Sequence, residues 1–230
     1  MKEKTCNPQI LGLLAGKSST KQLVYRQCKE LFKEFKKQLA LIAGELNSNI
    51  CNIDKQVVVS YKDKGDFEAH IHFSGDTIVF QLHSNVFTLE KSHSIWKHSY
   101  IKEDNMRAYF GMIHMYNFLS DSFKYNRQAD YGHLMGRIFI NKDKHFFTEG
   151  EREFGFLFND LEEQSFSANE MRQIIEKSMV YALDFDLTAP NFRDMREITV
   201  SQITKLGSDL SLSTRKKLGF KLSYEREPIK

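Results

Sequence analysis

The sequence has few of the features that mark extracellular proteins, small domains stabilised by bound metal, or disordered proteins. Its three cysteines, Cys6, Cys28 and Cys51, are widely spaced and form no CxxC pair, which favours free thiols over a disulfide framework or a zinc site. It has only three prolines and no linker rich in Gly, Pro or Ser. We therefore expect a single domain over residues 1–230, with residues 1–17 and 205–230 as loosely ordered ends.

Long hydrophobic runs are also missing. No segment approaches the roughly 18–20 apolar residues that a membrane-spanning helix needs. Residues 10–15 form a short apolar run, below the length of a signal-peptide core, and no Ala-x-Ala cleavage site follows. These observations predict a cytoplasmic protein that does not bind a membrane.

Helical periodicity is present at both ends of the chain. A capping-box pattern at Ser19 and Gln22 predicts a helix that starts near Ser19 and runs to about Leu46. Its apolar face is Val24, Cys28, Leu31, Phe35, Leu39, Ile42 and Leu46. A second pattern at Ser167 and Glu170 predicts a helix with an apolar stripe from Met171 to Leu183.

The chain between these helices has the short apolar segments of β-strands. We expect strands at residues 57–61, 67–73, 77–82, 86–89, 95–101, 109–118, 134–140, 145–148 and 154–158. Residues 118–131 fit either a short helix or a long loop. The chain is rich in aromatics, with 19 Phe and 9 Tyr, which suit half-buried strands. The predicted fold is α+β: an antiparallel meander of about six to eight strands packed against an N-terminal and a C-terminal amphipathic helix.

The hairpin at residues 67–83 has the clearest local pattern. With Gly75 and Asp76 as its turn, Glu68 faces His83, His70 faces Gln81 and His72 faces Val79. The histidines then lie on the face opposite the apolar residues. Three imidazoles and a carboxylate can bind a divalent metal, so Glu68, His70, His72 and His83 are candidate ligands. The alternative is a polar, solvated sheet face.

A basic stripe lies on the first predicted helix. Arg26, Lys29, Lys33 and Lys37 recur at near-helical spacing opposite its apolar face and are candidates for phosphate contacts. Glu30 and Glu34 interrupt the stripe, so a solvated helix face is the favoured interpretation and nucleic acid is not the expected partner.

The sequence supports three hypotheses about function. The first is a non-enzymatic module that binds a protein or a small ligand through its aromatic-rich sheet, because no catalytic signature is present. The second is a metal-dependent enzyme built on the Glu/His hairpin. The third is nucleic-acid binding by the basic helix face. The sequence does not fix the oligomeric state, and a homo-oligomer remains among the expectations.

Overall fold

The N-terminal helix is longer than its sequence pattern predicts. The structure, a computed structural model, describes residues 7–185, 192, 196–197 and 199–201. A continuous helical rod comprises α1 (Pro8–Leu13), the π-helical turn η1 (Leu14–Ser18) and α2 (Ser19–Ile50). Asn7 caps it by accepting the Gln9 N–H, 2.9 Å away. The predicted helix start near Ser19 is therefore wrong, because the rod already begins at Pro8, and the loose order expected for residues 1–17 stays a prediction. Residues 1–6 and 205–230 lie outside the described residues.

One stripe of α2 is buried, as the periodicity predicts. Val24, Cys28, Phe35, Leu39 and Ile42 are all almost fully buried. Leu46, the last residue of the predicted stripe, is exposed. The helix therefore contributes its middle to the core.

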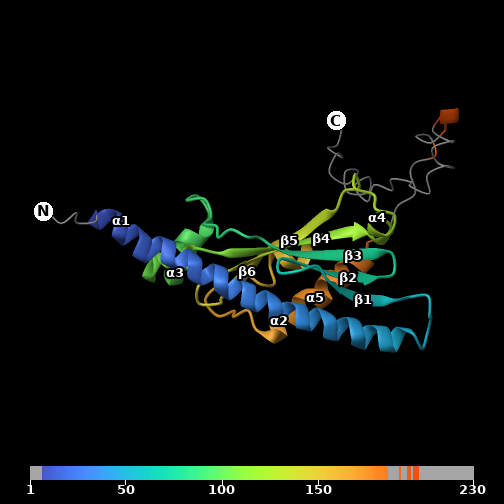
Figure 1. Cartoon of the computed structure of the whole chain (residues 1–230), viewed down its shortest axis with the longest axis horizontal. Coiled ribbons are helices and arrows are strands. Elements are labelled where there is room, and N and C mark those ends of the chain that lie inside the picture. Colours follow the sequence, from blue (N-terminus) through green and yellow to red (C-terminus); the bar gives the residue numbers. More distant parts are fainter. Residues whose placement is uncertain (1–6, 186–191, 193–195, 198, 202–230) are drawn as a thin grey trace, which may run out of the picture.

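Six antiparallel strands follow in simple meander order. They are β1 (Val59–Asp63), β2 (Glu68–Phe73), β3 (Asp76–Leu82), β4 (Gly111–Leu119), β5 (His133–Ile140) and β6 (Phe146–Gly150). Helix α5 (Ala168–Leu183) begins after Ser167, whose hydroxyl donates to the Glu170 carboxylate. Helices α2 and α5 pack on the same sheet face, where one large apolar cluster joins both helices to the strands (Figure 1). The α+β architecture predicted from the sequence is confirmed.

The turn of the β2–β3 hairpin lies one residue earlier than expected, so each β2 residue pairs with a residue two positions earlier than predicted. Ser74 and Gly75 form the turn, with Ser74 at a φ of 50°, and Asp76 pairs with Phe73. Strand β4 explains the shift, because Asp76 also pairs with Leu119 and the Ser120 N–H donates to the Gly75 carbonyl at 2.8 Å. A two-residue shift keeps every side chain on its face. The histidines therefore still lie opposite the helices.

Three of the predicted strands are wrong. Residues 86–89 contribute only an isolated bridge, between Phe87 and Phe110. Residues 95–101 form parts of the 3-10 turn η2 (Ser94–Lys97) and of α3 (Ser99–Glu103). Residues 154–158 begin inside another 3-10 turn, η4 (Arg152–Gly155), and continue beyond it. For residues 95–101 and 154–158, side-chain packing explains why no strand forms. Ile95, Tyr100 and Ile101 form a second apolar cluster with Met112, Phe139 and Phe147 on the sheet face opposite α2, and Phe154 and Phe158 are buried in the main core.

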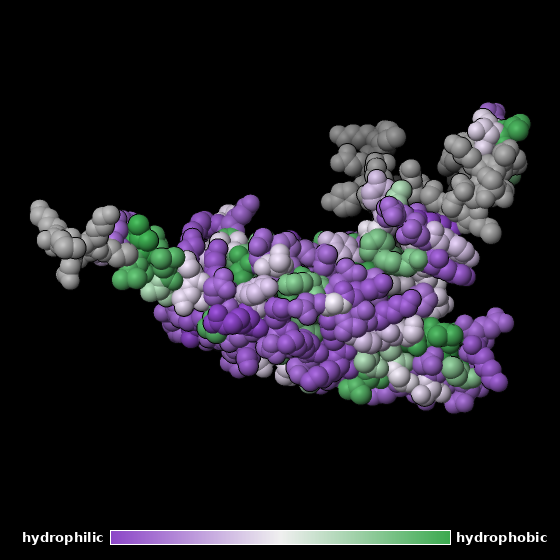
Figure 2. All heavy atoms as spheres, in the orientation of Figure 1, coloured by the Kyte–Doolittle hydropathy of each residue, from purple (hydrophilic) through white to green (hydrophobic). Residues whose placement is uncertain are grey.

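The first helical turns carry apolar side chains that the described structure does not cover. Ile10, Leu11, Leu13 and Leu14 are each more than half exposed, and Figure 2 shows this apolar surface at one end of the molecule. Helix α1 extends past the end of the sheet (Figure 1). Among the described residues, no helix is both long enough and apolar enough to cross a membrane.

Candidate functional site

The sheet face opposite α2 and α5, here called the outer face, carries most of the polar side chains of the strands. Paired residues of neighbouring antiparallel strands point to the same side of a sheet. A polar row therefore crosses five strands, and it consists of Glu68, Gln81, His114, Arg137 and Glu149. Beside it lie His70, Val79 and Tyr116, and then His72, Thr77 and Phe118.

A segment between β4 and β5 covers one end of this face. We call residues 120–132 the arm; it contains α4 (Ser120–Lys124) and the loop that follows. The Phe123 ring of the arm lies 5.0 Å from the His70 ring and 5.3 Å from the Phe118 ring, centroid to centroid. At the other end of the arm, a Cβ on Gly132 would lie 2.3 Å from the Phe118 ring. The arm therefore packs directly on the sheet.

Two hollows lie between the arm and the outer face. Both are lined by His70, Phe118, Phe123 and Asp130, so they adjoin. The first, the aromatic hollow, has a volume of about 400 Å³ and is also lined by Tyr116 and Tyr131. The second, the basic hollow, has a volume of about 410 Å³ and is also lined by Lys62, Lys64 and Arg127. Each volume is in the range of small-molecule sites.

Glu68 and His70 are in contact at the edge of these hollows. The His70 Nε2 lies 2.7 Å from the Glu68 Oε1. Burial lowers the pKa of His70 below its ordinary value, although the Glu68 hydrogen bond acts in the opposite direction. The imidazole is therefore neutral at pH 7, and its Nε2–H donates to the carboxylate. The remaining nitrogen, Nδ1, is then a hydrogen-bond acceptor or a base.

The other two candidate metal ligands have different partners. The His72 Nδ1 lies 2.8 Å from the Thr77 Oγ1 and 3.0 Å from the Ser120 Oγ, which fastens the start of the arm to the hairpin. The His83 Nδ1 accepts the Asn85 N–H at 3.0 Å, and the His83 ring packs against Phe87. The predicted facing of Glu68 and His83 is wrong, because Glu68 pairs with Gln81.

Of the four candidates, the structure brings only Glu68 and His70 into direct contact. Within the described part of the chain, no group of three or more His, Cys, Asp or Glu side chains is arranged to hold a metal ion. Structural and catalytic zinc sites use three or four protein ligands. The contact between Glu68 and His70 therefore orients the His70 imidazole, and it resembles a hydrogen-bonded pair more than a metal centre.

The basic residues of α2 mostly pair with carboxylates. Lys29 lies 2.6 Å from Asp66, Lys33 lies 2.9 Å from Glu30, and Lys37 lies 2.7 Å from Glu34. Arg26 is exposed on the same helix. This distribution is typical of a solvated helix face, in which the charges are locally compensated.

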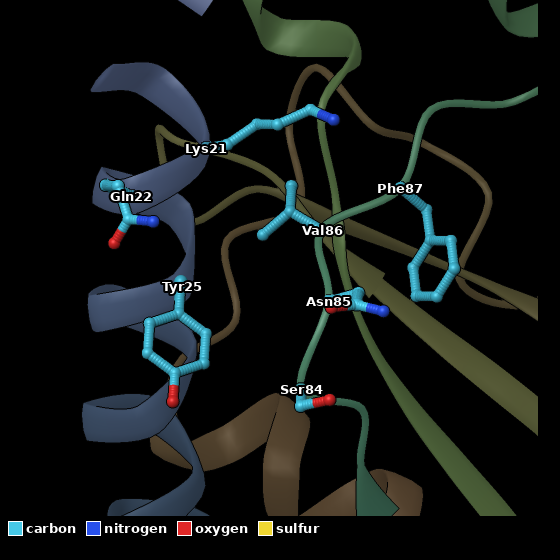
Figure 3. A pocket seen from close by; sticks show the side chains of 7 residues that line it. All are labelled: Lys21, Gln22, Tyr25, Ser84, Asn85, Val86 and Phe87. Atoms are coloured by element: carbon cyan, nitrogen blue, oxygen red, sulfur yellow. The ribbon is translucent and has the colours of Figure 1, made fainter. Parts of the chain in front are cut away.

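A third hollow lies between α2 and the chain that follows β3. It has a volume of about 500 Å³ and is lined by Lys21, Gln22, Tyr25 and residues 84–87. Figure 3 shows Val86 pointing toward α2, Lys21 reaching across above it, and Phe87 pointing away from the helix. Its lining residues include no histidine, so it lacks the oriented imidazole of the hollows beside the arm.

A fourth hollow, of about 490 Å³, lies near β6 and is lined by His93, His98 and Glu149 among others. The His93 Nδ1 accepts the Ile95 N–H at 3.2 Å, and its Nε2 lies 3.5 Å from Glu149. Both nitrogens of His93 therefore have protein partners. This histidine caps η2 rather than facing a ligand.

Sequence reasoning missed the contribution of the arm. Phe123, Asp130 and Tyr131 come from a segment whose pattern fits both a helix and a loop. The available signal was the close spacing of Phe118, Phe123, Tyr125 and Tyr131 in an otherwise polar segment.

No family model, no curated protein and no solved structure matches this chain.

Proposed function

We propose that this protein is a binding module whose ligand is a small molecule with an aromatic ring, held between the outer face and the arm. The proposal rests on one observation, the meeting of two hollows at His70 and Phe123. The volumes of the two hollows lie in the range of small-molecule sites, and aromatic rings and polar groups line them together. A protein partner would need a larger and flatter surface.

Phe123, in the arm, provides an aromatic ring that is not part of the hydrophobic core. Phe123 is 46% exposed although it touches both His70 and Phe118. An exposed phenylalanine beside a hollow can be covered by a planar ligand, and such aromatic pairs contribute about 0.5–1.5 kcal/mol beyond area burial. The neutral His70 adds one directed hydrogen bond through Nδ1.

We also propose a cytoplasmic location. Cys28 and Cys51 are free in the structure, and Cys28 is buried beside Gly111. Unpaired thiols suit a reducing compartment. Fractionation of cells that express the full chain tests this location, and recovery in a membrane or secreted fraction would contradict it.

The neutral fluorophore N-phenyl-1-naphthylamine is a suitable probe of the site. We expect its fluorescence to rise saturably with the wild-type chain, with a dissociation constant in roughly the micromolar range. Phe123→Ala and Tyr116→Ala should each weaken binding about two- to tenfold, because each removes a ring contact. Circular dichroism should confirm that both variants are folded.

Tyr25→Ala is the matched control, since Tyr25 lines the hollow beside α2. It should leave the affinity unchanged. Absence of saturable binding, or a loss of affinity in Tyr25→Ala with none in Phe123→Ala, would refute the proposed site.

A further inference from the structure

The two hollows differ in charge. The groups that line them include three cations, Lys62, Lys64 and Arg127, and two carboxylates, Glu68 and Asp130. All three cations line the basic hollow. Among the described residues, no lysine or arginine lines the aromatic hollow.

Both carboxylates already have partners. Glu68 accepts a hydrogen bond from the neutral His70 at 2.7 Å and keeps its negative charge. Asp130 accepts the Ser122 hydroxyl at 2.7 Å and lies 3.9 Å from the Arg127 guanidinium, and both side chains of this ion pair are almost fully buried. The charge of Arg127 is therefore compensated within the arm.

Lys62 and Lys64 differ from Arg127 in their surroundings. Lys62 pairs with His70 across β1 and β2, so its side chain lies on the outer face, and Lys64 follows β1 directly. Both are exposed, and neither ammonium forms an ion pair with a carboxylate in the region that the structure describes. Both lysines line the basic hollow together with His70, and their positive charge opposes protonation of the imidazole. Among the described residues that line the two hollows, the two lysines therefore outnumber the one carboxylate that has no cationic partner, Glu68.

We infer that the ligand joins an anionic group, such as a carboxylate, sulfonate or phosphate, to its planar ring. The anion would lie against Lys62 and Lys64 in the basic hollow, and the ring would lie against Tyr116 and Phe123 in the aromatic hollow. His70, which lines both hollows, would accept a hydrogen bond at the junction. This inference rests on the proposed function and adds the chemical class of the ligand.

Two probes that share a ring system separate the two claims. 8-Anilino-1-naphthalenesulfonate has the rings of N-phenyl-1-naphthylamine and adds a sulfonate. We expect the wild-type chain to bind the sulfonate probe more tightly, by roughly two- to tenfold, and this difference should shrink as salt is added. The double variant Lys62→Ala, Lys64→Ala should lose the difference and bind the neutral probe as the wild type does.

The double variant Lys33→Ala, Lys37→Ala is the control, because it makes the same change in net charge on α2. It should bind both probes as the wild type does. Equal binding of the two probes by the wild type, with no effect of Lys62→Ala, Lys64→Ala, would overturn the anionic ligand and leave the site standing. An equal effect of both double variants would also overturn it, as a general charge effect. Failure of both probes to bind would instead reject the site itself.

Discussion

The Nε2 atom of His70 lies 2.7 Å from the Oε1 atom of Glu68, two residues earlier on β2, beneath the Phe123 ring of the arm. This contact fixes which imidazole nitrogen carries the proton. It also leaves a neutral, oriented histidine between two hollows, and that histidine is the polar centre of the proposed site.

Three histidines of the outer face should make stability depend on pH; His70 is buried, and His72 and His114 are half-buried. Burial lowers the pKa of His70, His72 and His114 below the unfolded value of about 6.5. Between the folded and unfolded pKa values the unfolded chain binds more protons, so the free energy of unfolding increases with pH and is fully restored above about pH 6.5. We expect urea unfolding to show this loss as the pH falls toward about 5. His70→Gln should reduce the slope, whereas an unchanged slope would mean that His70 does not titrate differently on folding.

Gly132 should control the position of the arm. A Cβ there would lie 2.3 Å from the Phe118 ring, so Gly132→Ala must displace either the arm or that ring. We expect binding of N-phenyl-1-naphthylamine to weaken severalfold while the thermal midpoint changes little, because the arm lies outside the main core. Wild-type affinity in Gly132→Ala would show that the arm does not shape the site.

Gly111 marks the close approach of α2 to β4. A Cβ at Gly111 would lie 2.3 Å from the Cys28 Sγ, so Gly111→Ala should destabilise the protein by about 1–3 kcal/mol through overpacking. Gly44→Ala is the control; no atom lies within 4 Å of its added Cβ, and replacing an exposed helical glycine should stabilise by about 0.5–1 kcal/mol. Chemical denaturation measures both changes. Adding Cys28→Ala to Gly111→Ala should recover part of the loss, and strict additivity would contradict the contact.

The metal hypothesis has a direct test in elemental analysis. Only Glu68 and His70 of its four residues are in contact, and zinc sites need more protein ligands. We expect protein purified without a histidine tag to contain well below one equivalent of divalent metal, with the same content in His70→Ala. A stoichiometric metal that His70→Ala removes would restore the metal-dependent hypothesis.

The sequence predicts the layers of the fold better than its irregular parts. Apolar spacing identifies the buried stripe of α2, the existence of α5 and the alternating faces of the hairpin, because each depends on a local period. The hairpin register depends on the pairing of Asp76 with Leu119 in β4, which lies far away in sequence. The helical turns between Ser94 and Glu103 depend on packing against Phe139 and Phe147.

Only part of the candidate site can be predicted from the sequence, for the same reason. Glu68 and His70 lie on a strand with clear alternation, so their common face follows from the sequence. Phe123, Asp130 and Tyr131 lie in the arm, which has no sustained period, and only the folded chain brings them over His70. The exposed lysines of the site carry no local signal either, since they resemble those of any solvated strand end.

Chemical-shift mapping by nuclear magnetic resonance tests the central claim most directly, with 8-anilino-1-naphthalenesulfonate titrated into the isotopically labelled full chain. The account predicts that the largest amide shifts occur in β2, at the end of β4 and in residues 120–132, including His70 and Phe123. Shifts concentrated at Lys21–Tyr25 and residues 84–87, or spread evenly over the surface, would contradict it.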